Sequence, residues 1–345
     1  MKLSDFNYFL DPSLIAQHPL LERDRARLLI LHRETGRIEH RSFCDLIEYL
    51  RPDDVLIIND TRVFAARLCA RKEKTGGGIE LLLIRPVQKD TWEALASRRP
   101  RVRQRILFDD NSAGEIVGEG DSGRIFVRFQ ERSDFPQWLD HVGRTPLPPY
   151  IKRIHSNGDR EKEDRRAYQT VYATFPGSIA APTAGLHFTQ SLLDQVRAIG
   201  VQIYALTLHI GPGTFRPVRV TEIEQHTLES EHVRISHQVS GAIQKAKKSG
   251  NRVIAVGTTT VRALESAAKA PGQLSALDGW TDLFITPGHR FRVIDALITN
   301  FHLPRSTLLM LVSALAGREQ LLATYREAIR ERYRFYSFGD AMMII

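Results

Sequence analysis

Short apolar runs that end in polar clusters recur along the chain. In the first part, the runs 27–32 (RLLILH) and 55–58 (VLII) have the length of buried strands. A second short strand follows the first after a turn, and apolar residues at helical spacing predict a helix over 42–50. The run 55–58 ends at the polar segment 59–62. This part of the chain is therefore expected to alternate strand and helix.

The pattern changes between residues 63 and 129. Short apolar runs alternate there with turns such as 74–78 (KTGGG) and 118–121 (GEGD), and no convincing helix interrupts them. Several strands at this spacing predict a small antiparallel barrel or sandwich. A proline-rich connector follows at 143–150, and the highly charged stretch 151–166 is expected to be an exposed loop.

In the C-terminal half, helices and strands alternate. The expected helices are 189–199, 239–248, 261–268, 304–316 and 320–333. The expected strands are 201–210, 252–256, 283–285 and 294–298, with a further strand of unknown partner within 335–345. This alternation predicts a mainly parallel, helix-covered sheet. The fold class is therefore α/β, with a body formed by 1–62 and 151–345 and a small antiparallel β-barrel domain inserted over 63–150.

Composition narrows the class of protein only a little. The 345 residues are 42% hydrophobic and 26% charged, and the net charge of +8 permits a polyanionic partner without requiring one. The two cysteines are too few for a disulfide framework or a zinc site. No apolar run is long enough to span a bilayer, and no signal peptide is evident. We therefore expect a cytoplasmic protein without a membrane partner.

Candidate chemistry lies in five polar clusters. In α/β proteins, ligands gather at the carboxyl ends of the strands, where four of these clusters are expected. The clusters contain Asp60 and Arg62; His209, Gly211, Gly213 and Thr214; Thr258, Thr259 and Arg262; Asn300 and His302; and, before a helix, Thr183 and His187. Helix capping or backbone hydrogen bonding explains any one of them equally well. Together they predict a single ligand cavity.

Two of these clusters have backbone features suited to a ligand. The glycines of the turn 211–214 (GPGT) allow its main-chain N–H groups to approach a ligand closely. The segment 257–260 (GTTT) opens a helix, and free N–H groups at a helix N-terminus favour a carboxylate or phosphate. Arg262 follows one turn later and could pair with the same anion.

Other motifs carry weaker signals. The stretch 226–232 contains metal-ligand residue types, but its spacing matches no zinc motif, and a solvated face is the expectation. No nucleophile elbow or zinc-protease motif appears, and no dinucleotide fingerprint follows an early strand, so dinucleotide binding of the usual kind is not expected. Five arginines lie within 98–105. If the segment were extended, Arg99, Arg101, Arg103 and Arg105 would form a one-sided row, which would suit a phosphate backbone. Pro100 argues instead for an edge or loop.

The chain resembles the S-adenosylmethionine:tRNA ribosyltransferase-isomerase family of queuosine biosynthesis over almost its whole length. The blocks that carry the resemblance are DTRVFAARL, GRTPLPPYI, YQTVYA, AAPTAGLHFT, LHIGPGTFRPV, GNRVIAVGTTTVRALESAA, ITNFHLPRSTLLMLVSALAG and RFYSFGDAMMI. The resemblance implies an α/β body with an inserted barrel. Two segments of the chain depart from the family pattern. Leu228-Glu229 stands where the family has Met-His, and Arg103 stands where a turn glycine is commoner.

The resemblance also implies a reaction. The ribosyl part of S-adenosylmethionine, a consumed substrate, is transferred to 7-aminomethyl-7-deazaguanine at the tRNA wobble position. It rearranges to give epoxyqueuosine, with adenine and methionine released. Neither a metal nor a redox cofactor is then expected, because the sulfonium of the substrate supplies the driving force. The partner is then the tRNA anticodon loop, and a monomer is the expected state.

This chemistry assigns provisional roles to the clusters. A histidine, His209 or His187, would remove the proton from the 5′ carbon beside the sulfonium. His302 or Asn300 would donate a hydrogen bond or proton to the departing adenine. Phe188 and Phe215 are candidates to stack on the target base, with core packing as the alternative. A methyltransferase, a non-catalytic RNA-binding protein and an acyl-transfer or glycosidase-like enzyme remain the competing functions.

Overall fold

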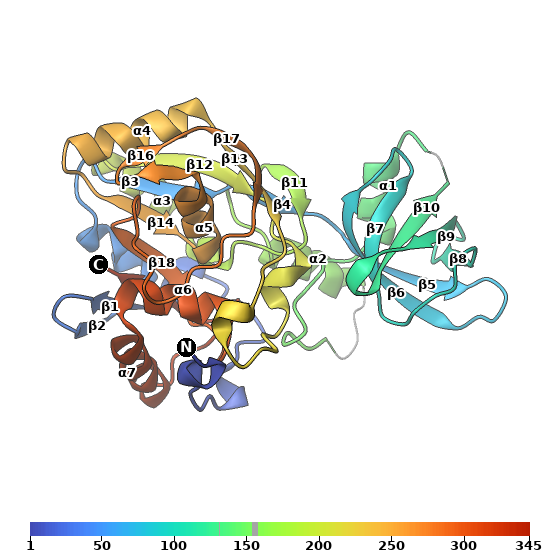
Figure 1. The fold of residues 1–345 in the computed structure, drawn as a ribbon, viewed down its shortest axis with the longest axis horizontal. Helices are drawn as coiled ribbons and strands as arrows, with labels where there is room; N and C mark the ends of the chain where they lie inside the picture. The colour runs from blue at the N-terminus through green and yellow to red at the C-terminus, as the bar shows by residue number, and fades with distance from the viewer. Residues whose placement is uncertain (131, 154–157) are drawn as a thin grey trace.

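The body of the molecule is built on a nine-stranded mixed sheet (Figure 1). In this computed structural model, which describes residues 1–130, 132–153 and 158–345, the strand order is β17-β13-β12-β3-β14-β18-β19-β1-β2. The strands are β1 (Arg27–His32), β2 (Arg37–Ser42), β3 (Val55–Asn59), β12 (Gln202–Leu208), β13 (Glu231–Ile235), β14 (Val253–Val256), β17 (Leu277–Thr281), β18 (Ala296–Asn300) and β19 (Ala341–Ile344).

Parallel pairing occupies the middle of this sheet. β12, β3, β14 and β18 pair in parallel, and every residue of β3, β14 and β18 is buried. Continuous apolar strands of this kind need cover on both faces. β19 runs parallel to β1 and antiparallel to β18, which identifies the partners of the C-terminal strand. β13 and β17 extend the other end of the sheet in antiparallel fashion.

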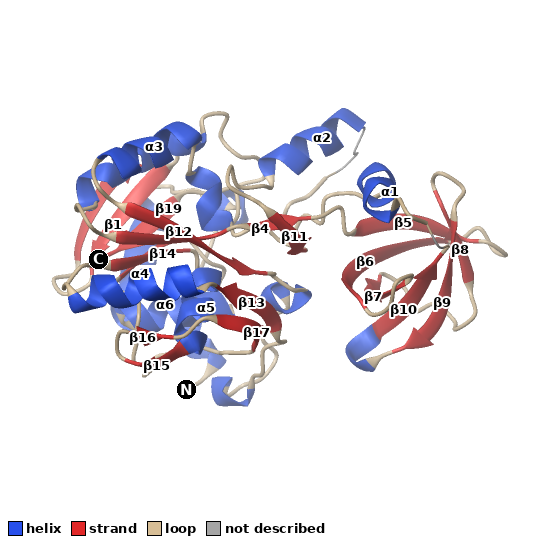
Figure 2. Cartoon of the chain, turned by 90° about the horizontal axis from the view of Figure 1, so that it is seen from above, coloured by secondary structure: helices blue, strands red, loops and turns tan. Residues whose placement is uncertain are grey.

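Helices cover both faces of the sheet (Figure 2). They are α3 (Gln190–Ala198), α4 (His237–Lys248), α5 (Thr258–Ala267), α6 (Thr307–Ala316) and α7 (Arg318–Arg330). α3 packs on one face and the other four on the opposite face, giving two separate apolar cores. Serine or threonine begins three of these helices: the side chains of Thr189, Ser236 and Ser306 each accept a backbone N–H of the first turn.

The second part is a closed six-stranded antiparallel barrel, at the right of Figure 1. Its strands are β5 (Arg67–Lys72), β6 (Gly78–Pro86), β7 (Thr91–Ala96), β8 (Arg105–Phe108), β9 (Ala113–Glu119) and β10 (Arg124–Phe129). Alternate side chains point into an apolar interior, to which Trp138 and Leu139 of α1 (Phe135–Val142) also contribute. The predicted α/β body with an inserted barrel is confirmed, whereas the exact domain limits stay a prediction.

Short elements lie around these two parts. They comprise α2 (Gly158–Ala167), the parallel pair β4 (Thr61–Val63) and β11 (Phe175–Ser178), the hairpin β15 (Ala268–Ala270) and β16 (Gln273–Leu274), and 3₁₀ helices at Leu3–Phe6, Pro12–Leu14, Arg23–Arg25, Phe43–Tyr49, Asp121–Gly123, Thr183–His187, Pro212–Phe215 and Ile223–Gln225. Among the described residues, no helix has the length and apolarity needed to cross a membrane.

Two expectations about local structure are wrong. The strand expected at 283–285 is absent, and β17, which begins six residues earlier, forms one edge of the sheet. The described part of the stretch expected to be a loop, 151–166, contains α2, while 154–157 lie outside the described residues. α2 has no apolar stripe, so hydrophobic periodicity could not reveal it. It is instead stabilised by acidic residues in its first turn and basic residues in its last.

For the arginine-rich segment, the edge or loop indicated by Pro100 is what the structure shows. Residues 98–104 form bends and turns between β7 and β8, so no one-sided row of guanidinium groups exists. Arg99 pairs with Glu119 on the surface. Arg103 has a φ of +65°, in the left-handed region that favours glycine, which explains why a glycine would suit this position.

Candidate active site

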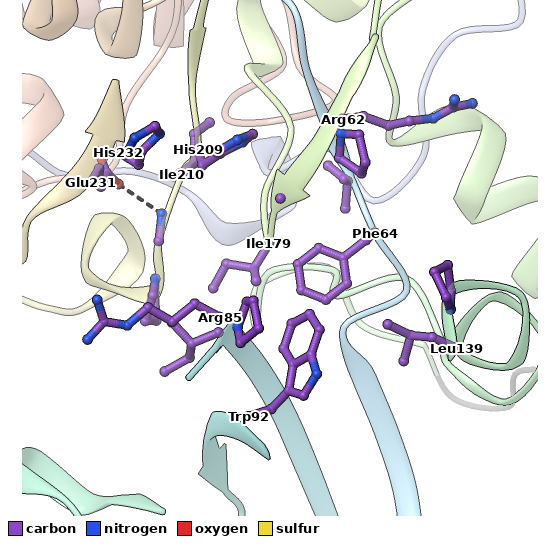
Figure 3. A pocket seen from close by; sticks show the side chains of 18 of the residues that line it. Arg62, Phe64, Arg85, Trp92, Leu139, Ile179, His209, Ile210, Glu231 and His232 are labelled. Carbon is purple, nitrogen blue, oxygen red and sulfur yellow. Dashed lines mark hydrogen bonds between the residues drawn. The ribbon is translucent and has the colours of Figure 1, made fainter. Parts of the chain in front are cut away.

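A cavity of about 1360 Å³ lies between the body and the barrel. The body contributes His209, Gly211 and neighbouring residues, and the barrel side contributes apolar side chains that include Phe64 and Trp92 (Figure 3). Enclosed ligand sites commonly combine such apolar walls with a few polar groups. This cavity therefore has the character of a binding site for an organic molecule.

His209 is the histidine of the predicted set that faces this cavity. Its Nδ1 lies 2.8 Å from Oγ1 of Thr61. When Nδ1 carries the hydrogen and donates it to Thr61, Nε2 keeps a lone pair that can accept a proton. Burial, and then the neighbouring His232, lower the pKa of His209 below its usual value. At neutral pH the ring is therefore uncharged and able to act as a base.

Gly177 makes room for the His209 ring. A Cβ at position 177 would lie 2.8 Å from Cε1 of His209, closer than real Cβ atoms approach. The residue also lies in β11, which pairs with the strand that carries Thr61. Any side chain at position 177 would therefore displace the histidine from its hydrogen bond.

A second, much smaller cavity of about 40 Å³ lies on the other side of Ile210, which lines both cavities. Six of the predicted residues line it: Thr183, Thr214, Thr258, Thr259, Asn300 and His302. Its volume suits a small polar group. The first turn of α5 opens on to it, as expected for a site that favours a carboxylate.

His187 is fully buried and reaches the small cavity only through Asn300. Nδ2 of Asn300 lies 3.1 Å from Nε2 of His187, and Oδ1 of Asn300 accepts a hydrogen bond from Thr183. Burial lowers the pKa of His187 to about 4. This histidine is neutral and enclosed, so it orients Asn300 and cannot itself meet a substrate that occupies either cavity.

His302 lines the small cavity in a similarly closed setting. Its Nε2 lies 2.9 Å from Oγ1 of Thr299, and its main-chain N–H donates to the hydroxyl of Tyr325. Burial lowers its pKa to about 3. Near neutral pH His302 is therefore a neutral hydrogen-bonding group and not a charged acid.

Glu231 holds the glycine turn that separates the two cavities. Its Oε1 accepts hydrogen bonds from the N–H of Gly211 at 3.0 Å and from the hydroxyl of Thr214 at 2.8 Å. Its Oε2 accepts from Nη1 of Arg262 at 2.7 Å, and both charged side chains are almost fully buried. Arg262, predicted to bind an anion, is thus engaged by a carboxylate of the protein.

The predicted site residues are therefore divided between two adjoining cavities instead of sharing one. Arg62, His209 and Gly211 line the large cavity. Asp60, His187, Gly213 and Arg262 line neither cavity. Asp60 is buried and accepts a hydrogen bond from Thr207, and a Cβ at position 213 would lie 3.0 Å from Cβ of Glu229. Phe188 is fully buried in one apolar core, which excludes stacking on a substrate, and the side chain of Phe215 lies outside the described residues.

Several residues of the site were not predicted. Glu229, Glu231 and His232 belong to the stretch expected to be a solvated face, yet Glu231 is buried and all three line the large cavity. The alternation of Glu231 with the buried Val233 and Ile235 was the signal that could have placed its carboxylate inward. Across the described residues, no cluster of three His, Cys, Asp or Glu side chains could hold a metal ion.

An α/β body with an inserted barrel and a cavity between them defines a class of protein, and the chain matches a known family of this class. The family model described as "Queuosine biosynthesis protein" matches residues 3–344, and the chain belongs to this family. It is 50% identical, over the full length of both proteins, to the S-adenosylmethionine:tRNA ribosyltransferase-isomerase of Symbiobacterium thermophilum. It also resembles the crystal structure of S-adenosylmethionine tRNA ribosyltransferase from Thermotoga maritima, at 37% identity and a TM-score of 0.57, covering 99% of this chain and 100% of the other. The chain is accordingly an enzyme of the ribosyltransferase-isomerase type that acts in queuosine biosynthesis.

Proposed function

We propose that this enzyme transfers the ribosyl part of S-adenosylmethionine to 7-aminomethyl-7-deazaguanine at the wobble position of tRNA and rearranges it. The product is epoxyqueuosine in the tRNA, and adenine and methionine leave. The observation that supports this most directly is the large cavity with His209 on one wall and aromatic side chains on the other. The names of its relatives support the same two substrates.

The size of the cavity fits two reactants. Single small-molecule sites usually enclose about 300–1000 Å³, and this one encloses about 1360 Å³. The additional volume allows an unstacked base to enter beside a nucleoside. A base in an anticodon loop is already single-stranded, so its extrusion costs less than extrusion from a duplex.

His209 is the proposed general base. The first step requires removal of a proton from the 5′ carbon, which the adjacent positive sulfur acidifies. A neutral imidazole that donates through Nδ1 to Thr61 presents its second nitrogen for this proton. His187 is an unsuitable alternative, because it is enclosed in the core.

The small cavity is the proposed site for the carboxylate of the methionine part. The N–H groups and hydroxyls of Thr258 and Thr259 at the start of α5 would bind it. Asn300 is held at the same cavity by Thr183 and His187, and it is available as a neutral hydrogen-bonding group. We further propose that no cofactor takes part, because cleavage of the sulfonium supplies the driving force.

Product analysis tests this proposal directly. Labelled S-adenosylmethionine is incubated with the full-length protein and tRNA that carries the precursor base. We expect adenine and methionine to appear in amounts equal to the epoxyqueuosine formed in the tRNA. Release of S-adenosylhomocysteine would identify a methyltransferase instead, and binding of tRNA with S-adenosylmethionine left intact would identify an RNA-binding protein without this activity.

A further inference from the structure

Beside the large cavity, one face of the sheet carries exposed aromatic and basic side chains. β13 and β17 pair so that His232 lies opposite Trp280 and Arg234 lies opposite Asp278. Because alternate residues of a strand point the same way, these four side chains share one face. Trp280 is 56% exposed although its neighbours on the other face of the sheet are buried. A large aromatic side chain in such a position is available to a partner.

Two aromatic side chains on this side of the molecule each lie beneath an arginine. The Cζ atom of Arg234 is 5.9 Å from the centre of the Phe175 ring, and that of Arg85 is 5.5 Å from the centre of the Trp280 ring. Arg85 comes from the barrel and Trp280 from the body, so the contact crosses the cavity. Phe175 is 43% exposed and immediately precedes Pro176, a lining residue of the same cavity.

A row of rings leads from this face to the proposed base. The ring of Trp280 contacts that of His232 edge-on at 5.3 Å, and the ring of His232 lies parallel to that of His209 at 6.1 Å. A base stacked on Trp280 would therefore lie next to one that enters the cavity. On the same face, a carboxylate oxygen of Asp278 lies 3.0 Å from Nε2 of His232.

We propose that Phe175, Trp280, Arg234 and Arg85, here termed the aromatic rim, bind the unpaired nucleotides on either side of the target base in a single-stranded RNA loop. The inference rests on the proposed function and specifies which surface receives the RNA. Proteins bind single strands by stacking bases on exposed aromatic rings and by placing arginines along the phosphates. Exposed Arg62 and Arg166 at the same cavity extend the basic character of the surface.

Binding of a precursor-containing anticodon stem-loop to the full-length protein tests the rim. We expect Trp280→Ala and Phe175→Ala each to raise Kd by at least about fivefold, since loss of one stacked base costs this much or more. Trp280→Phe should retain most of the affinity. Arg234→Ala should lower the slope of log Kd against log salt concentration by about 0.7, the value for one phosphate contact with a single strand.

Matched controls lie elsewhere on the protein surface. Phe9, 83% exposed, and Arg326, on the exposed side of α7, line neither cavity. Phe9→Ala and Arg326→Ala should leave Kd and its salt dependence unchanged. A fully paired RNA duplex of the same length should bind the wild type and Trp280→Ala with equal affinity, because it offers no unstacked base.

The possible outcomes distinguish a failure of the aromatic rim as an RNA-binding surface from a failure of the proposed function. Unchanged stem-loop affinity in Trp280→Ala and Phe175→Ala, with ribosyl transfer intact in the wild type, would overturn the rim and leave the function standing. Weakened stem-loop binding in both variants, together with an absence of ribosyl transfer by the wild type, would support the aromatic rim as an RNA-binding surface and exclude the proposed reaction. Equal weakening of loop and duplex binding would also overturn the rim, because it would show a charge effect without stacking.

Discussion

The two cavities on either side of Ile210 contain histidines in contrasting environments. The large cavity presents His209, half-buried beside a threonine hydroxyl, to a space that can admit a substrate. The small one is bordered by His302, with His187 behind Asn300, and both rings are enclosed by protein. The same residue type therefore has two uses here. Access to the cavity suits one histidine to proton transfer, and enclosure restricts the other two to neutral hydrogen bonding.

Replacement of His209 is the strongest test of this contrast. His209→Gln removes the proposed base while retaining an amide of similar length, and we expect kcat to fall about 10²- to 10⁴-fold. Single-turnover measurements with saturating substrates would report the chemical step. The matched control is His226→Gln, because His226 packs on Phe284 and lines neither cavity. Near-normal turnover by a folded His209→Gln protein would exclude His209 as the base.

The partition between the cavities depends on the buried pair Glu231 and Arg262. Glu231→Ala leaves the arginine buried without its partner and frees Gly211 and Thr214, so we expect the free energy of unfolding to fall by about 3–5 kcal/mol. Urea denaturation measures this loss.

Two further variants make this test specific. Replacing both Glu231 and Arg262 by methionine should recover much of the stability, because no unpaired charge remains. Glu224→Ala, at an exposed surface carboxylate, should cost less than about 1 kcal/mol. A loss that small in Glu231→Ala would show that the pair does not hold the turn.

The enclosed histidines should make the protein sensitive to acid. The pKa is about 4 for His187 and about 3 for His302, whereas both are near 6.5 in the unfolded chain. The unfolded state therefore binds more protons below pH 6.5. Stability is fully present above this pH and is lost as the pH falls towards the folded values.

Between pH 7 and pH 5 each of these histidines should contribute a loss of about 2 kcal/mol. Urea denaturation of His187→Gln and His302→Gln at pH 7 and pH 5 should show a correspondingly smaller difference than the wild type. His237→Gln, at an exposed position, is the control. A pH dependence equal to that of the wild type in both variants would contradict their neutral, enclosed state.

The smallest expected effect concerns the pH dependence of kcat/KM, which depends on His209 at the large cavity. The pKa of His209 is lowered by burial and then by His232, so the acid limb of kcat/KM should lie below pH 6.5. His232→Gln removes the second of these causes and should move this limb upward by less than about one pH unit. A pH–rate profile measures the shift. If the acid limb of the His232→Gln variant moved to lower pH, His232 would not act on His209 through its charge.

Local sequence patterns predicted much of the architecture. The buried runs of β3 and β14, the helices α3 and α4, and the alternating strands of the barrel are all visible in the chain, because burial of apolar side chains follows the period of each element. α2 was missed because charged residues, and not an apolar stripe, make up its sequence. The contacts of β19 could not be predicted either, since its partners are β1 and β18, one of them more than 300 residues away.

By itself, the sequence determined the fold class, the polar clusters at strand ends, and membership of a family whose blocks extend along the whole chain. The tertiary structure alone decided how those clusters divide. It placed His209 at an open cavity and His302 in an enclosed one, and it turned Glu231 inward to hold the turn between them. The physical reason is that the access and protonation of a side chain depend on which distant strands and loops pack around it. No local pattern of residues specifies those neighbours.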